Sequence, residues 1–275
     1  MSTQRWPTTA HVLERAGCRL HYWLTGPDER PLIVLTHGLT LDHRMFDPQV
    51  PALAGDYRVL TWDLRGQGRS QPIGTAFTIG ALLDDLLAIL DQVGRQRAII
   101  VGYSLGGIVA QELAFRFPRR VLALVAFGCS CITLPIPWHM VLAMRLAPLP
   151  LRLMRFVPYW PMLRLSAAQM AERPEVRVQV ADMLSRVSQD TFLKLVTALA
   201  RCMHGEPGYG IELPLLIAYG ECDRYGDPKR AAKGCARRDR QARVAVIPNA
   251  GHNANQDNPE AFNALLLDFL HTHPV

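Results

Sequence analysis

Short apolar runs recur along this chain, and amphipathic helical patterns separate them. Most of the runs lack any alternation of polar and apolar residues, which is typical of strands buried on both faces of a sheet. These runs lie at residues 31–38, 56–63, 97–104, 120–128, 214–223 and 242–252, with an alternating outer strand at 19–24. The helical patterns lie at residues 79–94, 106–118 and 258–273. Strands that alternate with helices predict an α/β fold whose mostly parallel central sheet is flanked by helices.

The alternation is interrupted once, between residues 131 and 210. This interval holds helical patterns and a proline-punctuated apolar stretch, but no run that fits a buried strand. It falls between two predicted strands of the sheet, so we expect a helical cap that lies over the carboxyl edge of the strands and shapes a pocket. The predicted domains are therefore a core at residues 1–130 and 211–275 and a cap at 131–210.

Composition narrows the class of protein. With 49% hydrophobic and 20% charged residues, the chain is typical of a soluble globular protein. Its six cysteines lack zinc-finger spacing, and its first residues lack the apolar core of a secretory signal. No uncharged apolar stretch reaches the roughly 18 residues that a membrane span needs. We therefore expect a cytoplasmic protein without a membrane span.

The net charge of +6 is concentrated in the predicted cap, where nine basic residues accompany five acidic ones. A nucleic-acid-binding protein would have a stripe of Lys and Arg or a recognised binding motif, and this chain has neither, so we expect no nucleic-acid partner. A solvated helix surface explains the charge most simply. Attraction of an anionic substrate or a membrane surface is the alternative. The oligomeric state is not predicted.

A serine lies at the junction of a buried strand and a helix, in the pattern G-x-S-x-G formed by Gly102, Ser104 and Gly106. This pattern predicts a tight strand-turn-helix that holds the hydroxyl out at the top of the sheet. Small residues two positions before and after the serine are needed there, because a Cβ would clash where the chain folds back. The helix N-terminus would stabilise developing negative charge next to the serine.

An activated serine needs a base, and the base needs an orienting carboxylate. Asp223 and His252 each follow a predicted buried strand, so both are expected at the same sheet edge as Ser104. Taken singly, Asp223 fits a turn or helix cap and His252 fits a surface loop. We predict the three as a catalytic set, with Asp227 as the fallback acid and Glu221 as a weaker one.

An acyl-transfer site also needs donors for the oxyanion. The backbone N–H of Leu105, directly after the serine, is one predicted donor. The second is the N–H of Leu39, in the loop after the strand at 31–38, where Gly38 permits close approach of the backbone. We interpret His37 as a structural residue that braces this loop.

The motifs LTHGL (35–39), WDLRGQGRS (62–70), VGYSLGG (101–107), GECD (220–223) and NAGH (249–252) together resemble the α/β-hydrolase fold family, in particular its single-domain, lidded, esterase-like members. The resemblance covers nearly the whole chain outside residues 131–210. It implies that family's α/β fold, with a helical cap inserted after the sixth strand. It also implies that Asp63 and Arg65 brace a turn and take no part in catalysis.

The predicted function is a serine hydrolase that cleaves a carboxylic ester of a small apolar or aromatic substrate through an acyl-enzyme. Haloalkane dehalogenases and epoxide hydrolases of this family carry Asp at the position of Ser104, which argues against both. The same three residues, the Ser-His-Asp triad, leave four alternative functions open: carbon–carbon bond hydrolase, thioesterase, cofactor-independent dioxygenase and small-molecule receptor. The mechanism requires no metal or organic cofactor, and the chain has no phosphate-binding glycine motif.

Four side chains are predicted to line the substrate pocket: Tyr103, Trp138, Met144 and Trp160. The first is next to the serine, and the other three come from the aromatic and sulfur-rich start of the cap. Such side chains suit an apolar pocket. The alternative is that the cap residues form the core of the cap itself.

Overall fold

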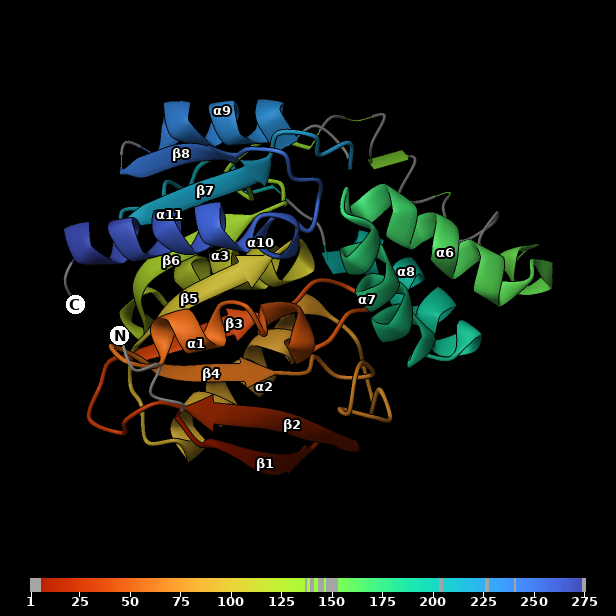
Figure 1. Ribbon diagram of the computed structural model, residues 1–275, viewed down its shortest axis with the longest axis horizontal. Helices are drawn as coiled ribbons and strands as arrows, with labels where there is room; N and C mark the ends of the chain where they lie inside the picture. Colours follow the sequence, from red (N-terminus) through yellow and green to blue (C-terminus); the bar gives the residue numbers. More distant parts are fainter. Residues whose placement is uncertain are drawn as a thin grey trace.

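The computed structural model describes most of the chain, namely residues 6–136, 138, 141, 142, 146, 153–202, 205–225, 228–239 and 241–273. Eight strands form one sheet in the order β1-β2-β4-β3-β5-β6-β7-β8 (Figure 1). Their bounds are Thr8–Arg15, Cys18–Thr25, Leu32–Thr36, Arg58–Trp62, Ala98–Tyr103, Val121–Phe127, Leu215–Gly220 and Ala242–Ile247 for β1 to β8. The strands β3 to β8 are all parallel to one another, while β2 pairs antiparallel with β1 and with β4. The predicted α/β fold with a mostly parallel sheet is confirmed.

The central strands are buried throughout, which explains their continuous apolar sequences. Every residue of β3, β5 and β7 is buried. The edge strand β1 was not predicted, because a strand without a fully buried residue shows little hydrophobic pattern in its sequence.

Helices cover both faces of the sheet. In Figure 1, α1 and α11 lie on one face, and α2 and α3 lie on the other. The helical elements of the main domain are η1 His43–Phe46, α1 Val50–Leu53, α2 Ile79–Gln92, α3 Leu105–Arg116, η2 Pro118–Arg120, α9 Pro228–Arg238, α10 Ala254–Asp257 and α11 Pro259–Thr272. The predicted start of α11 is confirmed, since Asn258 accepts the N–H of Ala261 at 3.2 Å and Pro259 opens the helix.

Between β6 and β7, the residues from 153 to 202 are mostly helical and form η3 Met154–Phe156, α6 Tyr159–Met170, α7 Pro174–Ser185 and α8 Gln189–Cys202. They lie together beyond one end of the sheet, at the right of Figure 1, and constitute the cap. The cap is tied to the main domain through Arg44, whose Nη1 lies 2.7 Å from the carboxylate of Asp182. Among the helices that the structure describes, none combines the length and the apolar composition needed to cross a bilayer.

The strand order creates a switch point between β3 and β5. The chain runs from β3 to β4 on one side and then returns to place β5 on the other side of β3. Thr36, at the end of β3, pairs with Gly102, near the end of β5, so the two strands end at the same level. Loops that leave two such strands diverge and open a crevice at the carboxyl edge, where ligands bind in open α/β sheets.

Candidate active site

Ser104 occupies a strained turn between β5 and α3. Its backbone has φ 51° and ψ −114°, a conformation that L-residues rarely adopt and that is found mostly where the surrounding structure enforces it. A methyl group on Gly102 would overlap the carbonyl oxygen of Gly106, and one on Gly106 would overlap the carbonyl oxygen of Thr36. The tight turn predicted from G-x-S-x-G is therefore confirmed. The predicted clash where the chain folds back explains Gly102, whereas Gly106 is needed because the end of the neighbouring strand β3 leaves no room for a Cβ.

The loop after β3 lies directly against this turn. A Cβ on Gly38 would come within 2.7 Å of the Tyr103 ring and 3.2 Å of the Ser104 Cβ. The peptide that joins Gly38 to Leu39 is consequently next to the serine. This is where the sequence predicted the second oxyanion donor.

His37 holds that peptide in position. Its Nδ1 lies 2.7 Å from the Gly38 carbonyl oxygen, and its Nε2 accepts the N–H of Leu64 at 2.9 Å. The ring is fully buried, and burial lowers its pKa, so it is neutral and carries its proton on Nδ1. Because the peptide bond is trans, fixing the Gly38 carbonyl turns the N–H of Leu39 the opposite way. These contacts agree with the predicted bracing role of His37.

Asp223 and His252 are in direct contact. Asp223 follows β7, His252 follows β8, and the carboxylate Oδ2 lies 2.9 Å from the imidazole Nδ1. The Asp223 side chain has no exposed surface, and that of His252 is 5% exposed. The other carboxylate oxygen accepts the N–H of Tyr225 at 2.8 Å. The pair is thus oriented and nearly dry, so its electrostatic interaction is stronger than it would be in water.

The imidazole faces the strand ends that carry Ser104. Its Cε1 lies 3.3 Å from the position that a Cβ on Gly128 would take, just after β6. The Phe127 carbonyl, one residue earlier, accepts the N–H of Ser104 at 2.9 Å. The ring is hydrogen-bonded to Asp223, but no hydrogen bond joins it to the Ser104 hydroxyl. Catalytic hydrogen bonds are often long or absent before substrate binds.

Two residues that sequence reasoning missed hold the His252 loop. The carboxylate of Asp257 is buried and accepts the N–H of Gly251 at 2.8 Å, together with the N–H groups of Glu172 at 3.0 Å and Arg173 at 3.1 Å in the cap. Asn253 accepts the Tyr103 hydroxyl at 2.6 Å. In the sequence, the only sign that Asp257 and Asn253 belong to the site was their closeness to His252 along the chain. The loop is therefore bonded both to the cap and to the residue before Ser104.

The remaining predicted residues lie in varied places. Tyr103 is fully buried, and its ring centroid lies 5.0 Å from that of His252. Trp138 and Trp160 are 77% and 50% exposed on the cap. Glu221 is exposed and accepts the N–H of Asn249 at 3.0 Å, whereas the carboxylate that contacts the His252 imidazole is that of Asp223. Asp227 and Met144 lie outside the described residues.

Asp42, His43 and Asp63 form a cluster whose ligand atoms are close enough to hold a metal ion. Both oxygens of Asp63 already accept hydrogen bonds, Oδ1 from the His43 backbone and ring at 2.8 Å and Oδ2 from the Arg69 N–H at 2.7 Å. Burial acts to raise the pKa of Asp63, but the hydrogen bonds and charge interactions with its neighbours, chiefly His43, together outweigh burial and lower the pKa. Asp42 is held by Arg44 at 2.7 Å. These hydrogen bonds hold the loops in place, and they satisfy both carboxylates without a metal ion.

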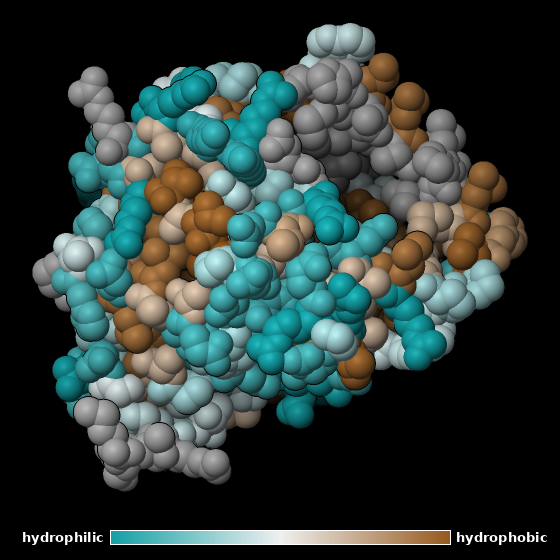
Figure 2. Space-filling model, turned by 45° about the horizontal axis from the view of Figure 1, so that its top comes forward, coloured by the Kyte–Doolittle hydropathy of each residue, from teal (hydrophilic) through white to brown (hydrophobic). Residues whose placement is uncertain are grey.

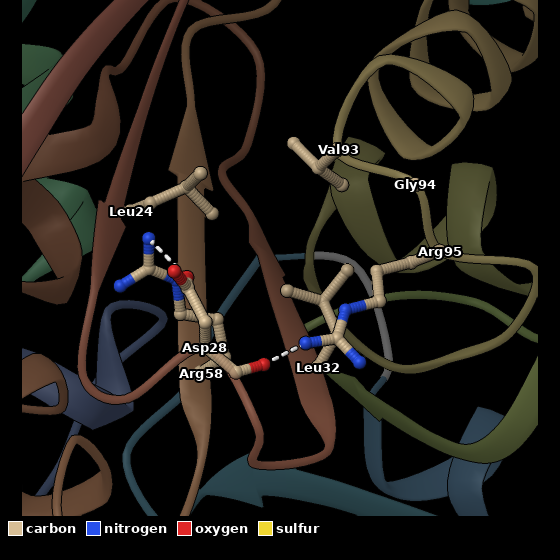
Figure 3. A pocket seen from close by; sticks show the side chains of 7 residues that line it. All are labelled: Leu24, Asp28, Leu32, Arg58, Val93, Gly94 and Arg95. Carbon is tan, nitrogen blue, oxygen red and sulfur yellow. Dashed lines mark hydrogen bonds and ion pairs between the residues drawn. The ribbon is translucent and has the colours of Figure 1, made fainter.

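The main domain also contains a pocket of about 310 Å³ at the amino ends of the parallel strands, opposite the edge that carries Ser104. Figure 3 shows its lining residues, Leu24, Asp28, Leu32, Arg58, Val93, Gly94 and Arg95. Arg58 pairs with the Asp28 carboxylate at 2.8 Å, and Arg95 donates to the Asp28 carbonyl. Because these charged groups interact with each other, they are not free to bind a ligand in the pocket.

Known proteins resemble the chain in sequence and in fold. It is 40% identical over 99 residues to 3-oxoadipate enol-lactonase 1 of Acinetobacter baylyi, a match that covers 36% of this chain and 37% of the relative. It is 35% identical over 122 residues to epoxide hydrolase B of Mycobacterium tuberculosis, covering 42% of this chain and 34% of the relative. The match thus spans about a third of the length of each of these curated relatives.

The agreement in fold extends over nearly the whole chain. The crystal structure of a hydrolase from Pseudomonas aeruginosa superposes with a TM-score of 0.82 at 26% identity, covering 95% of this chain and 98% of that one. The model of the alpha/beta hydrolase family matches residues 33–265, from the second residue of β3 into α11. This range includes the strained serine turn, the buried Asp–His pair and the cap between β6 and β7. The chain therefore belongs to the alpha/beta hydrolase family.

Proposed function

We propose that this protein is a serine hydrolase that cleaves a carboxylic ester of a small apolar or aromatic molecule. The observation that carries the proposal is the buried hydrogen bond between Asp223 and His252, at the sheet edge where Ser104 sits on its strained turn. A carboxylate, an imidazole and a hydroxyl at one edge are the groups that nucleophilic acyl transfer needs.

In the proposed mechanism, Ser104 Oγ attacks the ester carbonyl while His252 Nε2 takes the hydroxyl proton. Asp223 holds the opposite nitrogen, Nδ1, so that Nε2 is the free base, and stabilises the imidazolium that forms. The tetrahedral intermediate collapses as the imidazolium returns its proton to the departing alcohol. Water, deprotonated by the same imidazole, then attacks the acyl-enzyme, and the imidazolium returns this proton to Ser104 Oγ as the acid is released.

The oxyanion is assigned to the N–H groups of Leu39 and Leu105. Leu105 begins α3, so its N–H has no acceptor one turn earlier in the helix, and the positive end of the helix dipole reinforces it. The N–H of Leu39 is turned by the contact of His37 with the Gly38 carbonyl. Donors held in this way need no reorganisation when charge develops on the substrate oxygen.

Two comparisons bear on the choice of substrate. The Acinetobacter relative is named as an enol-lactonase, and an enol lactone is a cyclic carboxylic ester, which supports an ester substrate. The mycobacterial relative is named as an epoxide hydrolase. The family's epoxide hydrolases carry Asp as nucleophile, whereas this chain has Ser104, so an ester is the better match.

The test combines turnover with active-site labelling. Hydrolysis of p-nitrophenyl esters of increasing acyl length should be measured for the wild type and for Ser104→Ala, and separate samples of both should be treated with a fluorophosphonate probe. We expect wild-type hydrolysis, one probe adduct on Ser104 by peptide mass spectrometry, and a fall in kcat of at least about 10⁴-fold in Ser104→Ala. An unlabelled Ser104 in folded protein, or a variant that keeps the wild-type rate, would refute the proposal.

A further inference from the structure

The cap exposes an apolar surface where η3 meets α6. Its large apolar side chains are exposed to between 44% and 72%, and they all lie between residues 153 and 165. We call these residues the cap patch: Leu153, Phe156, Val157, Trp160 and Leu165. Figure 2 shows hydrophobic residues on the side of the molecule where the cap lies in Figure 1, and a second hydrophobic group on the other side, over the main domain.

The cap patch includes two apolar side chains on the exposed side of α6. Leu163, Ala167 and Met170 point into the protein and are buried, whereas Trp160 and Leu165 lie on the outer face. An amphipathic surface helix normally presents polar side chains to water. An exposed apolar face of this kind marks a surface that contacts another molecule.

Two arginines of the cap patch region have no acidic partner among the described residues. The guanidinium carbon of Arg155 lies 4.7 Å from the Phe156 ring centroid, and that of Arg164 lies 5.6 Å from a Trp160 ring centroid. Residues 131–171 contain no Asp or Glu. Elsewhere on the surface, arginines do pair with carboxylates, as Arg243 does with Asp268 at 2.6 Å.

The positive charge next to the cap patch indicates what kind of molecule binds there. A symmetric dimer through the cap patch would bring the arginines of two copies toward each other, since a two-fold interface uses the same surface on both subunits. An anionic surface complements them. Arginines beside exposed Trp, Phe and Leu side chains are the composition of helices that lie in the interface of a lipid bilayer.

We propose that the cap patch docks onto the surface of an anionic phospholipid membrane. Phe156 and Trp160 insert among the lipid headgroups, where aromatic side chains are favoured. The guanidinium groups of Arg155 and Arg164 then bind lipid phosphates while their aliphatic stems stay on the apolar surface. The docking requires no reaction at Ser104.

The experiment is co-sedimentation of the full chain with two kinds of vesicle, one of pure phosphatidylcholine and one of phosphatidylcholine mixed with phosphatidylglycerol. We expect at least tenfold stronger binding to the anionic vesicles, weakened by added salt. The double variant Arg155→Gln/Arg164→Gln should bind them about 30-fold more weakly, since each basic residue contributes about a factor of five. Phe156→Ser/Trp160→Ser should lose at least about tenfold.

A matched control removes two positive charges from a helix of the main domain. Lys233→Gln/Arg237→Gln lies on α9, which packs against β7 and β8 and is separate from α6 in Figure 1, and should bind within about twofold of the wild type. Circular dichroism of each variant verifies its fold. Equal binding to the two vesicles, or an equal loss in the control, overturns the proposal. Concentration-dependent self-association that Phe156→Ser/Trp160→Ser abolishes would likewise overturn it, by identifying a second copy as the occupant.

Discussion

Replacing Asp223 by Asn removes a negative charge beside His252 and keeps the size of the side chain. The amide oxygen can still accept the N–H of Tyr225, as the carboxylate does at 2.8 Å, so the loop should keep its shape. The amide NH₂ would then face Nδ1 of the imidazole. That contact favours the tautomer with its proton on Nε2, which cannot take a proton from Ser104.

The expected loss follows from the charge that the imidazole acquires in the transition state. Asp223 and His252 are 0% and 5% exposed with 2.9 Å between their bonded atoms, which puts the centres of charge about 4 Å apart. At an effective dielectric constant of about 20, such a pair interacts with about 4 kcal/mol. Removing it should lower kcat/KM by about 10³-fold, with KM nearly unchanged because the charge appears only on the way to the transition state.

The assay is steady-state hydrolysis of a p-nitrophenyl ester, with thermal unfolding to verify that the variant is folded. Glu221→Gln is the matched control, because it neutralises an exposed carboxylate two residues away that bonds the N–H of Asn249. We expect the control to stay within about threefold of the wild type, as surface charges contribute little. If Asp223→Asn keeps a tenth or more of the activity, or if Glu221→Gln loses more, the assignment of the acid is refuted.

Three further substitutions test the structure around the site. Ser104→Gly should have a free energy of unfolding about 1 kcal/mol higher than Ser104→Ala, because glycine relieves the strain at φ 51°; equal urea midpoints would contradict this. Tyr103→Phe leaves the buried Asn253 amide oxygen without its 2.6 Å donor, which should lower the free energy of unfolding by about 1–3 kcal/mol; an unchanged thermal midpoint would argue against that bond. Burial lowers the pKa of His37 below 6.5, so below this pH the unfolded chain binds a proton that the folded chain does not, and stability falls by up to about 1.4 kcal/mol per pH unit. His37→Gln keeps both hydrogen-bonding groups and does not titrate, so its stability should fall less steeply from pH 7 to 5 in urea denaturation; identical slopes would exclude this contribution.

The sequence alone was sufficient for the features that depend on neighbouring residues. Strands such as β3 and β5 are buried on both faces, so their apolar runs are continuous and easily recognised. The turn at Ser104 was predictable for a similar reason, because the clash that excludes a side chain from Gly102 involves Gly106, four residues away. The cap was visible as a gap in the series of strands.

Only the tertiary structure decided which distant groups meet. The sequence offered Asp223, Asp227 and Glu221 as acids, and folding brings Asp223 to the imidazole of His252. The sequence analysis assigned no role to Asp257. In the folded protein its carboxylate joins the cap to the His252 loop. The physical reason is that backbone preferences and burial act over a few residues and leave a periodic pattern. A hydrogen bond between loops depends on strand order and on the level at which each strand ends, and neither leaves a periodic pattern in the sequence.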